Sequence, residues 1–600
     1  MSEENEEPRQ IRVTDIGEYV RFKSCQRRLK LATDRTLTRA LPFAERLFNS
    51  LDPILQSSAT KAEDDWERAL IDSGYQRIGC RQQSDNTQAE SLWGDFLADV
   101  SQLEPGTIAF AREVVVSATL GNFEVLGRID FLLVEWRDVA PYFWVVECKS
   151  SRKDRTYHRI QLAAYMCVLE HLLSESPASA ANGGIIGPGN LEASIARIDE
   201  TLNRPQEFVG LDRLSLETEK ADVVRFVSTS GPLATVLALS LDELPYMLDG
   251  RCDSCVFSVH CLTESARQRR LELLGIPPTM TSALRSAGVT SIDSLAEIDE
   301  RGDAALRIIR NPQFDGDLGR LIKQASARRA SLVPRPEIDD AYRVQPYPAR
   351  TAGQLPRHEI DGERLVRIYL CVDYDYTENR IGALSAHITE SEWELHTPFD
   401  ENSRLPQATC IEVDPEDPDE QREISGATIV RYQTEQWSGD VVQDGVAERR
   451  LIQEFFTSLV VEIAEVAQRS LAPVHFYVWS RSEMSQLIEG CSRAGSSLLW
   501  HLRELLGCRA HEEQLIFSCV QSEVDQRFGL AWTSRGLVVA SDLPWFGNKF
   551  HWKRTIGGQE FDLDRIFEQD IFDFKTTLGI KENGDWDDAQ NPAVRWRFEI

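Results

Sequence analysis

The residues of this chain that are best placed to do chemistry lie between positions 130 and 165. Glu147 ends a run of apolar residues, Lys149 follows two positions later, and Asp130 lies upstream. Because residues two apart on a β-strand point to the same side of a sheet, Glu147 and Lys149 should share one face, and Cys148 should point away. Burying a carboxylate and an ammonium group is costly, so we interpret the pair as part of a site. The alternative is a surface salt bridge on an edge strand, which the apolar run disfavours.

These residue types suit metal-assisted hydrolysis of a phosphodiester bond. Asp130 and Glu147 offer the hard oxygen ligands that Mg²⁺ or Mn²⁺ prefers. Lys149 can orient the attacking water or neutralise charge that builds up on the phosphate. Gln161 and Tyr165 are four residues apart, so on a helix they lie on one face and can hold the scissile strand by hydrogen bonds. We therefore expect catalytic roles for all five residues.

The surrounding sequence predicts the elements that must position these side chains. A β-hairpin is expected over residues 111–136, with its turn at Gly121 and Asn122. An apolar strand that includes residues 143–146 follows and delivers the carboxylate and the lysine. A basic loop then leads into the helix of the glutamine and the tyrosine. Together these elements predict an α/β arrangement in which strands and one helix converge on the site.

Asp130, Glu147, Lys149, Gln161 and Tyr165, in this order and spacing, resemble the PD-(D/E)XK nuclease superfamily. The QxxxY spacing on the helix is similar to that of its RecB-like branch. The resemblance implies a restriction-endonuclease-like α/β core and a metal-dependent nuclease activity.

An early helix is expected to contribute to the same site. Residues 57–75 have helical periodicity. Its inward stripe should consist of Trp66, Ala69 and Leu70. RecB-like nucleases place an acid or a histidine on such a helix as a further metal ligand, and the resemblance makes Glu63 the candidate, with Glu67 next. The alternative is that these acids form a solvated face.

Four cysteines have the arrangement of a metal site. Cys252, Cys255 and Cys261 are clustered, and Cys25 lies far upstream. We do not expect disulfides, because the composition is that of a cytosolic protein. The residues alone fit zinc and an iron–sulfur cluster equally well. One cysteine before the core and three after it resembles the AddB-type and CRISPR-associated iron–sulfur nucleases, which implies a [4Fe–4S] cluster with Zn²⁺ as the alternative.

The formal net charge of −30 opposes general binding of nucleic acid. Basic residues are nevertheless grouped. The group beside the catalytic triplet, which we expect to bind DNA, consists of Arg152, Lys153, Arg155 and Arg159. A second basic patch is expected from Arg21, Lys23, Arg27, Arg28 and Lys30. The charge pattern therefore favours a local binding cleft over a uniformly coated surface.

Four domains or segments are expected. Residues 1–265 form the nuclease domain with the cysteine cluster, residues 266–333 a small helical domain, and residues 334–362 a proline-rich linker. Residues 363–600 form the last domain.

Within the helical domain, residues 271–300 resemble a helix-hairpin-helix, with turns at Gly275-Ile276 and Ala287-Gly288-Val289. The family uses hairpin amides to bind a DNA phosphate. Pro277 stands where a second glycine is usual and removes one N–H. A purely structural hairpin is therefore an equally good interpretation.

The order of strands and helices in residues 363–600 resembles an RNase H-like exonuclease domain. Asp373 and Asp375 occupy the first acidic motif, but the later strand ends lack acids. We therefore predict that this domain has lost catalysis and serves as a scaffold or partner surface. Glu483 and Asp525 are the residues that would contradict this prediction.

The function predicted from these patterns is a Mg²⁺- or Mn²⁺-dependent deoxyribonuclease, with exonuclease favoured over endonuclease. It would act on DNA ends or single strands, in repair or in defence against foreign DNA. No P-loop motif occurs, so a separate helicase is the expected partner. The alternatives are an iron–sulfur DNA-binding subunit of a helicase–nuclease complex and a zinc-clipped structural subunit. With no apolar run of membrane-spanning length and no signal peptide in the sequence, we expect a cytoplasmic protein.

Overall fold

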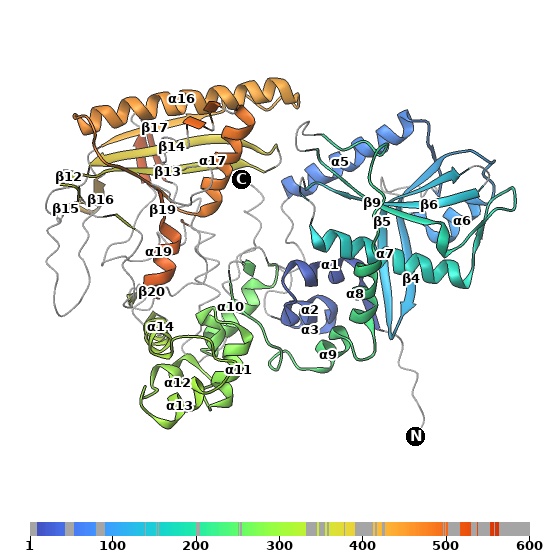
Figure 1. Cartoon of the computed structure of the whole chain (residues 1–600), viewed down its shortest axis with the longest axis horizontal. Coiled ribbons are helices and arrows are strands. Elements are labelled where there is room, and N and C mark those ends of the chain that lie inside the picture. The colour runs from blue at the N-terminus through green and yellow to red at the C-terminus, as the bar shows by residue number, and fades with distance from the viewer. Residues whose placement is uncertain are drawn as a thin grey trace. The chain divides into compact units, whose positions relative to one another are not determined.

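The fold was analysed in a computed structural model of the chain (Figure 1). The structure describes residues 9–41, 53–79, 91–137, 140–151, 153, 155–199, 204–249, 251–252, 255–331, 345–346, 355–356, 359–376, 378–390, 412–414, 417–422, 426–495, 497–498, 500–501, 517–529, 537, 553–556 and 559–562. The chain divides into two compact units, Met1–Tyr246 and Met247–Ile600. The sequence analysis placed the end of the nuclease domain later, at residue 265. Most of the expected linker, residues 334–362, lies outside the described residues.

A seven-stranded mixed sheet organises the first unit. Its strands are β1 (Arg9–Arg12), β2 (Gln76–Arg77), β3 (Ser91–Leu92), β4 (Ala109–Leu120), β5 (Phe123–Arg137), β6 (Ala140–Lys149) and β9 (Leu191–Arg197). The main order is β2-β4-β5-β6-β9, and β1 and β3 pair with β5 and β4, respectively. The β4–β5 and β5–β6 pairs are antiparallel, whereas β1 runs parallel to β5 and β9 runs parallel to β6. The mixed α/β fold class expected from the sequence is confirmed.

The central hairpin forms where the sequence predicted it, because Gly121 permits the turn. Gly121 has a φ of +62°, and a Cβ at this position would lie 2.4 Å from the carbonyl oxygen of Val227. Any other residue would suffer both backbone strain and a steric clash. The turn thereby sets the register in which β4 and β5 face each other.

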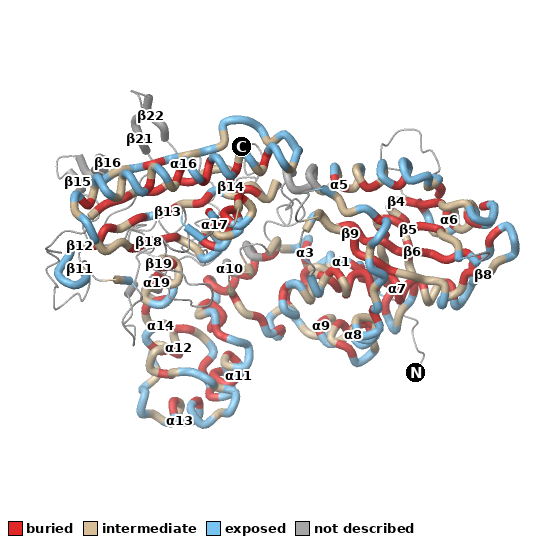
Figure 2. The backbone as a smooth tube through the Cα atoms, turned by 45° about the horizontal axis from the view of Figure 1, so that its top comes forward, coloured by how far each residue is buried: buried red, intermediate tan, exposed pale blue. Residues whose placement is uncertain are grey.

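Helices cover both faces of this sheet (Figure 1). They are α1 (Val13–Arg21), α2 (Gln26–Thr33), α3 (Arg35–Arg39), α5 (Pro53–Asp72), α6 (Trp93–Val100), α7 (Thr156–Glu175), α8 (Glu217–Val227) and α9 (Pro232–Ala238). The apolar face of α7 packs on one side of the sheet, and Trp66 and Leu70 of α5 pack on the other. Ala69, expected to face inward, is exposed. Figure 2 shows buried residues concentrated along β4, β5, β6 and α7.

Short elements complete the first unit. They are β7 (Ala178–Ser179), β8 (Ile185–Ile186) and the 3₁₀ helix η1 (Pro188–Asn190). They lie between α7 and β9 in the sequence, so the chain makes a small hairpin before it enters the last strand of the sheet.

The second unit begins with a group of short helices. They are α10 (Ser258–Arg267), η3 (Leu271–Leu274), α11 (Pro278–Ser286), α12 (Ile292–Ala296), α13 (Asp303–Ile309) and α14 (Leu318–Ser331). Gly275 (φ +65°) ends η3, and Gly288 (φ +90°) lies in the turn after α11. The two glycine turns thus lie where the sequence placed them. The buried Glu272 accepts a 2.7 Å hydrogen bond from Arg285, which ties η3 to α11.

A five-stranded sheet forms the core of the rest of the second unit. Its strands are β13 (Val366–Asp375), β14 (Arg380–Glu390), β17 (Ala427–Tyr432), β18 (Val474–Val478) and β19 (Phe517–Cys519). The order is β17-β14-β13-β18-β19. The first three are antiparallel, whereas β13, β18 and β19 are parallel.

Helices α16 (Val441–Ala467) and α17 (Arg481–Ala494) pack on this sheet and bury its apolar face. The remaining elements are α19 (Val520–Arg527), β10 (Gln345–Pro346), β11 (Glu359–Ile360), β12 (Glu363–Arg364), β15 (Glu412–Asp414), β16 (Asp417–Arg422), β20 (Phe528–Gly529), β21 (Lys553–Ile556) and β22 (Gln559–Asp562). Among the helices described in either unit, none is long and apolar enough to cross a bilayer.

Candidate metal-dependent active site

The candidate site lies where the sheet of the first unit opens. Pairing between β5 and β6 ends at Phe131 and Val146, while β6 continues beside β9 as far as Lys149. Asp130 and Glu147 are the next residues on the two diverging strands. Side chains at such an opening can reach the same space from both strands.

Glu113 lies directly opposite Asp130 across the β4–β5 pair. The register joins Arg112 to Phe131 and Val114 to Ile129, and the pairing is interrupted between them. Glu113 has a left-handed backbone with a φ of +58°. Such a conformation costs about 1–3 kcal/mol in a residue other than glycine, and it is concentrated at functional sites. The strained backbone therefore makes Glu113 a candidate functional residue.

The sequence analysis missed Glu113. Its one signal is a charged residue inside a strand rich in valine, and that signal is also typical of an exposed strand position. The structure shows that side-chain alternation slips here, because Ala111 and Val114 both face the α7 side of the sheet. A prediction from sequence assumes that side chains along a strand alternate strictly between the two faces of the sheet, so it does not detect this change.

Three carboxylates converge at the opening. Each of Glu63, Glu113 and Asp130 offers one oxygen atom, and these atoms lie within 4.8 Å of one another. Glu63 comes from α5, so the structure brings this predicted residue to Asp130. Three carboxylate oxygens at this separation form a donor set suited to a hard divalent cation. Glu67, the second candidate on α5, instead accepts a 2.8 Å hydrogen bond from Arg112.

Glu147 and Lys149 form a contacting ion pair beside this cluster. Glu147 is 1% exposed, and its Oε1 is bonded to the ammonium group of Lys149. The other oxygen, Oε2, is buried without a hydrogen-bond partner in the described structure. A buried unpaired carboxylate oxygen is costly, and a bound cation would satisfy it. As expected, Cys148 points to the opposite face, and its backbone N–H donates a 2.7 Å hydrogen bond to Asp130.

Burial and mutual repulsion raise the proton affinity of the carboxylates. Burial, reinforced by the charge of Asp130, raises the pKa of Glu147 to about 8. Burial also raises the pKa of Glu113 to about 7, with further contributions from Asp130 and Glu63. The pKa values of Asp130 and Glu63 are raised as well, mainly by burial. A cation at the cluster would oppose all four shifts, since it stabilises the ionised forms.

Positive charges of the chain partly balance these acids. Burial alone would lower the pKa of Lys149, but the carboxylates of Glu147 and Asp130 outweigh it and raise that pKa, so the amine stays protonated. Arg112 donates to Glu63 at 3.0 Å, and Arg128 forms an ion pair with Glu113. These basic side chains thus lie among the acids and offset part of their mutual repulsion.

The two QxxxY residues are buried on α7. Tyr165 is 2% exposed, and its hydroxyl donates a 2.7 Å hydrogen bond to the carbonyl oxygen of Arg128. A Cβ at Gly127 would lie 2.5 Å from the ring of Tyr165, so only glycine permits this approach. Gln161 is also buried, on the same helix. Tyr165 therefore supports the strand that carries Asp130, and the expectation that both residues hold the scissile strand stays a prediction.

The predicted DNA-binding residues have different environments. Arg152 lies outside the described residues, and Lys153 and Arg155 are exposed before α7. Arg159 donates to Glu219 at 2.7 Å and therefore ties α7 to α8.

The second basic patch is only partly at the surface: Arg21 and Lys23 are exposed, whereas Arg27 and Lys30 are buried. Arg27 is fully buried and donates to the carbonyl oxygen of Leu241 at 2.9 Å, and Lys30 donates to that of Leu237 at 3.0 Å. The sequence alone does not show whether a basic side chain on these helices bonds to another part of the fold or faces solvent.

The four cysteines are divided between the two units. Cys25 belongs to the first and directly precedes α2, after Lys23 and Ser24, which both have left-handed backbones. The other three cysteines belong to the second unit. There the N–H of Cys255 donates to the carbonyl oxygen of Cys252 at 3.0 Å, and Cys261 is buried on α10.

In the second unit, the acidic residues expected from an RNase H-like motif lie at the end of β13. Asp373 is exposed. Asp375 accepts a 3.1 Å hydrogen bond from the N–H of Glu378. Glu483 closes a capping box at the start of α17, where it accepts a 2.7 Å hydrogen bond from the N–H of Ser480. Asp525 is exposed on α19.

Comparison with known proteins identifies the domain that holds the carboxylate cluster. Residues 22–262 match the family model described as the PD-(D/E)XK nuclease superfamily. The solved structure titled "Crystal structure of SSO0001" is 16% identical to this chain, with 43% of this chain and 89% of that chain covered and a TM-score of 0.21. A search of curated proteins finds no match. The family match and the site geometry agree: the chain carries a PD-(D/E)XK nuclease superfamily domain over residues 22–262, of a superfamily that implies metal-dependent nuclease activity.

Proposed function

We propose that this protein is a Mg²⁺- or Mn²⁺-dependent deoxyribonuclease that acts on DNA ends or single strands, as an exonuclease. The observation that carries the proposal is the convergence of Glu63, Glu113 and Asp130 beside the buried Glu147–Lys149 pair. These are the hard ligands and the fixed cation that phosphodiester hydrolysis requires.

The three clustered carboxylates and Glu147 would hold the metal ion. When bound, the ion polarises the scissile phosphate and lowers the pKa of a bound water. Lys149 keeps its proton and places a fixed positive charge where negative charge develops on the phosphate. Tyr165 and Gly127 keep β5 seated on α7, which holds Asp130 in place. The chain thus contributes a pre-arranged set of charges on rigid strands.

The test is cleavage by the purified full-length chain. End-labelled and internally labelled single- and double-stranded DNA, with matched RNA, are incubated with Mg²⁺, Mn²⁺ or EDTA. We expect metal-dependent loss of end label from DNA and none with EDTA. Cleavage of RNA alone would overturn the DNA assignment, and internal cuts on circular DNA would overturn the exonuclease assignment. Metal-dependent DNA binding without any cleavage would favour the DNA-binding subunit instead.

We further propose that Cys25, Cys252, Cys255 and Cys261 hold a [4Fe–4S] cluster, with Zn²⁺ as the alternative. The support is the donor set of four thiols, the tight turn before Cys25 and the turn that joins Cys252 to Cys255. Cys25 lies more than two hundred residues before the other three cysteines in the sequence. Closing so long a loop costs entropy, and the binding energy of the cluster would offset this cost and so contribute to folding.

This cluster is tested by replacing each of the four cysteines by serine. We expect loss of iron, of visible absorption and of thermal stability, to a similar extent at all four positions. Cys371, on β13, is the control, and its serine variant should keep iron and stability. Stoichiometric zinc without iron after anaerobic preparation would replace the iron–sulfur assignment, and a Cys25→Ser variant identical to wild type would refute the four-cysteine site.

The second unit supports two structural assignments that complete the proposal. The order β17-β14-β13-β18-β19, with three antiparallel strands followed by parallel ones, supports an RNase H-like domain that serves as a scaffold. The glycine turns around α11 support a helix-hairpin-helix-like segment. We propose a helicase as the working partner, in DNA repair or defence in the cytoplasm. Co-purification of a helicase with the tagged chain, retained at moderate salt, tests the partnership.

A further inference from the structure

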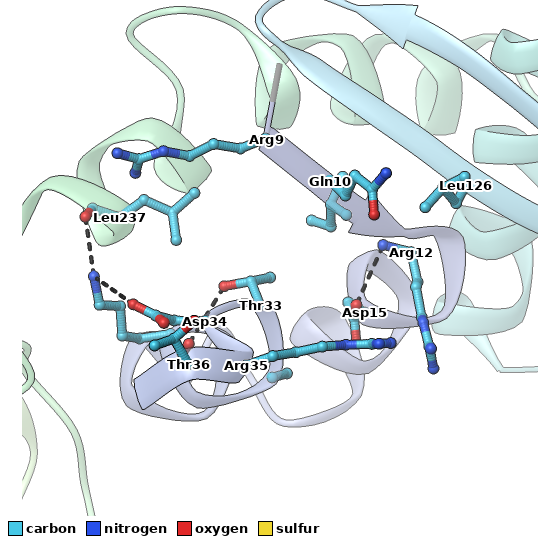
Figure 3. Close-up of a pocket in the computed structure, with 13 residues that line it drawn as sticks. Arg9, Gln10, Arg12, Asp15, Thr33, Asp34, Arg35, Thr36, Leu126 and Leu237 are labelled. Atoms are coloured by element: carbon cyan, nitrogen blue, oxygen red, sulfur yellow. Dashed lines mark hydrogen bonds and ion pairs between the residues drawn. The ribbon is translucent and has the colours of Figure 1, made fainter. Parts of the chain in front are cut away.

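A polar pocket of about 520 Å³ lies in the first unit, outside the carboxylate cluster (Figure 3). Strand β1 forms one wall, the α2–α3 junction forms another, and Leu237 of α9 closes a third side. Three arginines line it, namely Arg9 and Arg12 from β1 and Arg35 from the start of α3. All three are exposed.

The pocket has an excess of positive charge. Among the residues that the structure describes, no ion pair joins the guanidinium groups of Arg9, Arg12 or Arg35 to an acid. The lining also contains two acids, and the charges of Arg12 and Arg35 act on the carboxylate of Asp15 without forming an ion pair with it. Asp15 accepts from the N–H of Arg12 at 3.2 Å, and Asp34 accepts from the N–H of Leu37 at 2.9 Å.

Lys30 is the fourth basic residue of the lining, and its ammonium group, in contrast, has partners within the protein. Its ammonium group donates to the carbonyl oxygen of Leu237 at 3.0 Å and lies 3.7 Å from Asp34. The three arginines are therefore the guanidinium groups of the pocket that form no ion pair with a described residue, in a chain whose net charge is −30. Guanidinium groups present planar sets of N–H donors that match the oxygen atoms of a phosphate.

The sheet places this pocket next to the nuclease site. Strand β1 pairs in parallel with β5, and Arg12 lies opposite Leu126. Asp130 is four residues further along β5, which corresponds to about 13 Å at the rise of a β-strand. Arg128, which is exposed on β5, lies between them. A nucleic-acid strand anchored in the pocket would therefore be within a few nucleotides of the carboxylates.

From this placement we infer that the pocket of Arg9, Arg12 and Arg35 is a phosphate-binding site for the DNA strand whose cleavage is proposed above. The inference rests on that proposed function. The phosphate has two possible sources, an internal phosphodiester of the strand or a 5′-terminal phosphate. Both present anionic oxygens to the same guanidinium groups.

The experiment compares DNA binding by two full-length variants in the non-cleaving Glu147→Gln background. The pocket variant carries Arg9→Glu and Arg35→Glu. The matched control carries Arg39→Glu and Arg225→Glu, which change the net charge equally at exposed positions of the same unit outside the pocket. Arg35→Glu is compatible with folding, because an acid at the start of a helix is favourable. Thermal melting verifies that both variants are folded.

The probe is a short single-stranded oligonucleotide with either a 5′-phosphate or a 5′-hydroxyl, titrated over a range of salt concentrations. We expect the pocket variant to bind roughly tenfold or more weakly than the control, with the slope of log K against log salt reduced by about 0.7 for each phosphate that the variant no longer neutralises. Equal weakening for both oligonucleotides identifies an internal phosphodiester. Weakening confined to the 5′-phosphorylated one identifies the terminal phosphate.

Pocket and control variants with the same affinity and the same salt slope would overturn the inference. The proposed function is tested separately, by incubating the wild-type protein and a divalent metal with the same single-stranded DNA and measuring cleavage. If wild type cleaves this DNA and the pocket variant binds it as tightly as the control, only the phosphate-site inference is refuted. If binding depends on the pocket but wild type does not cleave, only the proposed nuclease activity is refuted.

Discussion

Acidic residues lie on β-strands in both units, but their surroundings differ. In the first unit, Asp130 and Glu147 lie where two strands diverge, and one oxygen of Glu147 is buried without a hydrogen-bond partner in the described structure. In the second, Asp373 is exposed and Asp375 accepts from a nearby backbone N–H. The two pairs of acids therefore differ in how well they are arranged to hold a cation. Burial, convergence from several elements and an unsatisfied oxygen distinguish the first site.

Removing a carboxylate from the first unit should have the largest effect. Asp130→Ala and Glu147→Ala should each abolish cleavage, because a ligand is lost from a rigid strand without disturbing the packing. Single-turnover cleavage of labelled DNA with Mn²⁺ measures the loss, and circular dichroism checks the fold. Turnover at the wild-type rate in either variant would show that the convergence of acids is incidental.

Lys149→Ala should lower the cleavage rate by about two to four orders of magnitude, equivalent to roughly 3–5 kcal/mol of transition-state stabilisation. The reason is the loss of the fixed charge that faces the phosphate. The affinity for Mn²⁺, measured by calorimetry, should remain close to that of wild type, since the lysine is not a ligand. A variant that loses metal binding instead would indicate that Lys149 acts only by keeping Glu147 ionised.

Stability should depend on pH and on metal through the first unit. Burial raises the pKa of Glu147 to about 8 and that of Glu113 to about 7, whereas glutamates in the unfolded chain titrate near about 4.3. The folded state therefore holds these protons more tightly, so the stability they contribute is present at low pH and is lost as the pH rises through 7–8.

This effect is measured as the melting temperature between pH 5 and pH 9 in EDTA and in Mg²⁺. In EDTA, wild type should lose stability toward pH 8 more steeply than Glu113→Gln. Mg²⁺ should restore the loss in wild type, because it stabilises the ionised carboxylates. Identical profiles for wild type and Glu113→Gln would contradict the role assigned to this residue. Asp373→Asn is the matched control and should follow wild type.

The smallest effect is expected in the second unit. Replacing Asp373 and Asp375 together by alanine should leave DNA cleavage unchanged within about twofold, since we propose that this domain has lost catalysis. A large fall in activity, with the protein folded and Glu147 intact, would show that the two units share the chemistry. The same cleavage assay decides between the two outcomes.

The local sequence was sufficient to predict the strands and helices of the site and the acidic and basic residues that the strands carry. The hairpin with its turn at Gly121, the shared face of Glu147 and Lys149, and the helix of Tyr165 follow from periodicity and turn chemistry, which neighbouring residues encode. The family match over residues 22–262 agrees with the resemblance seen in those residues.

Tertiary structure decided which charged side chains meet and which turn inward. Glu113 became visible only through its left-handed backbone opposite Asp130, and Glu63 reaches the same cluster from a helix far away in the sequence. In the sequence, Arg27 and Arg159 look like any surface arginine. In the fold, Arg27 donates to the carbonyl oxygen of Leu241 in the turn after α9, and Arg159 donates to Glu219 on α8. The physical reason is that periodicity depends on near neighbours, whereas the burial and partners of a charge depend on elements that only the folded chain brings together.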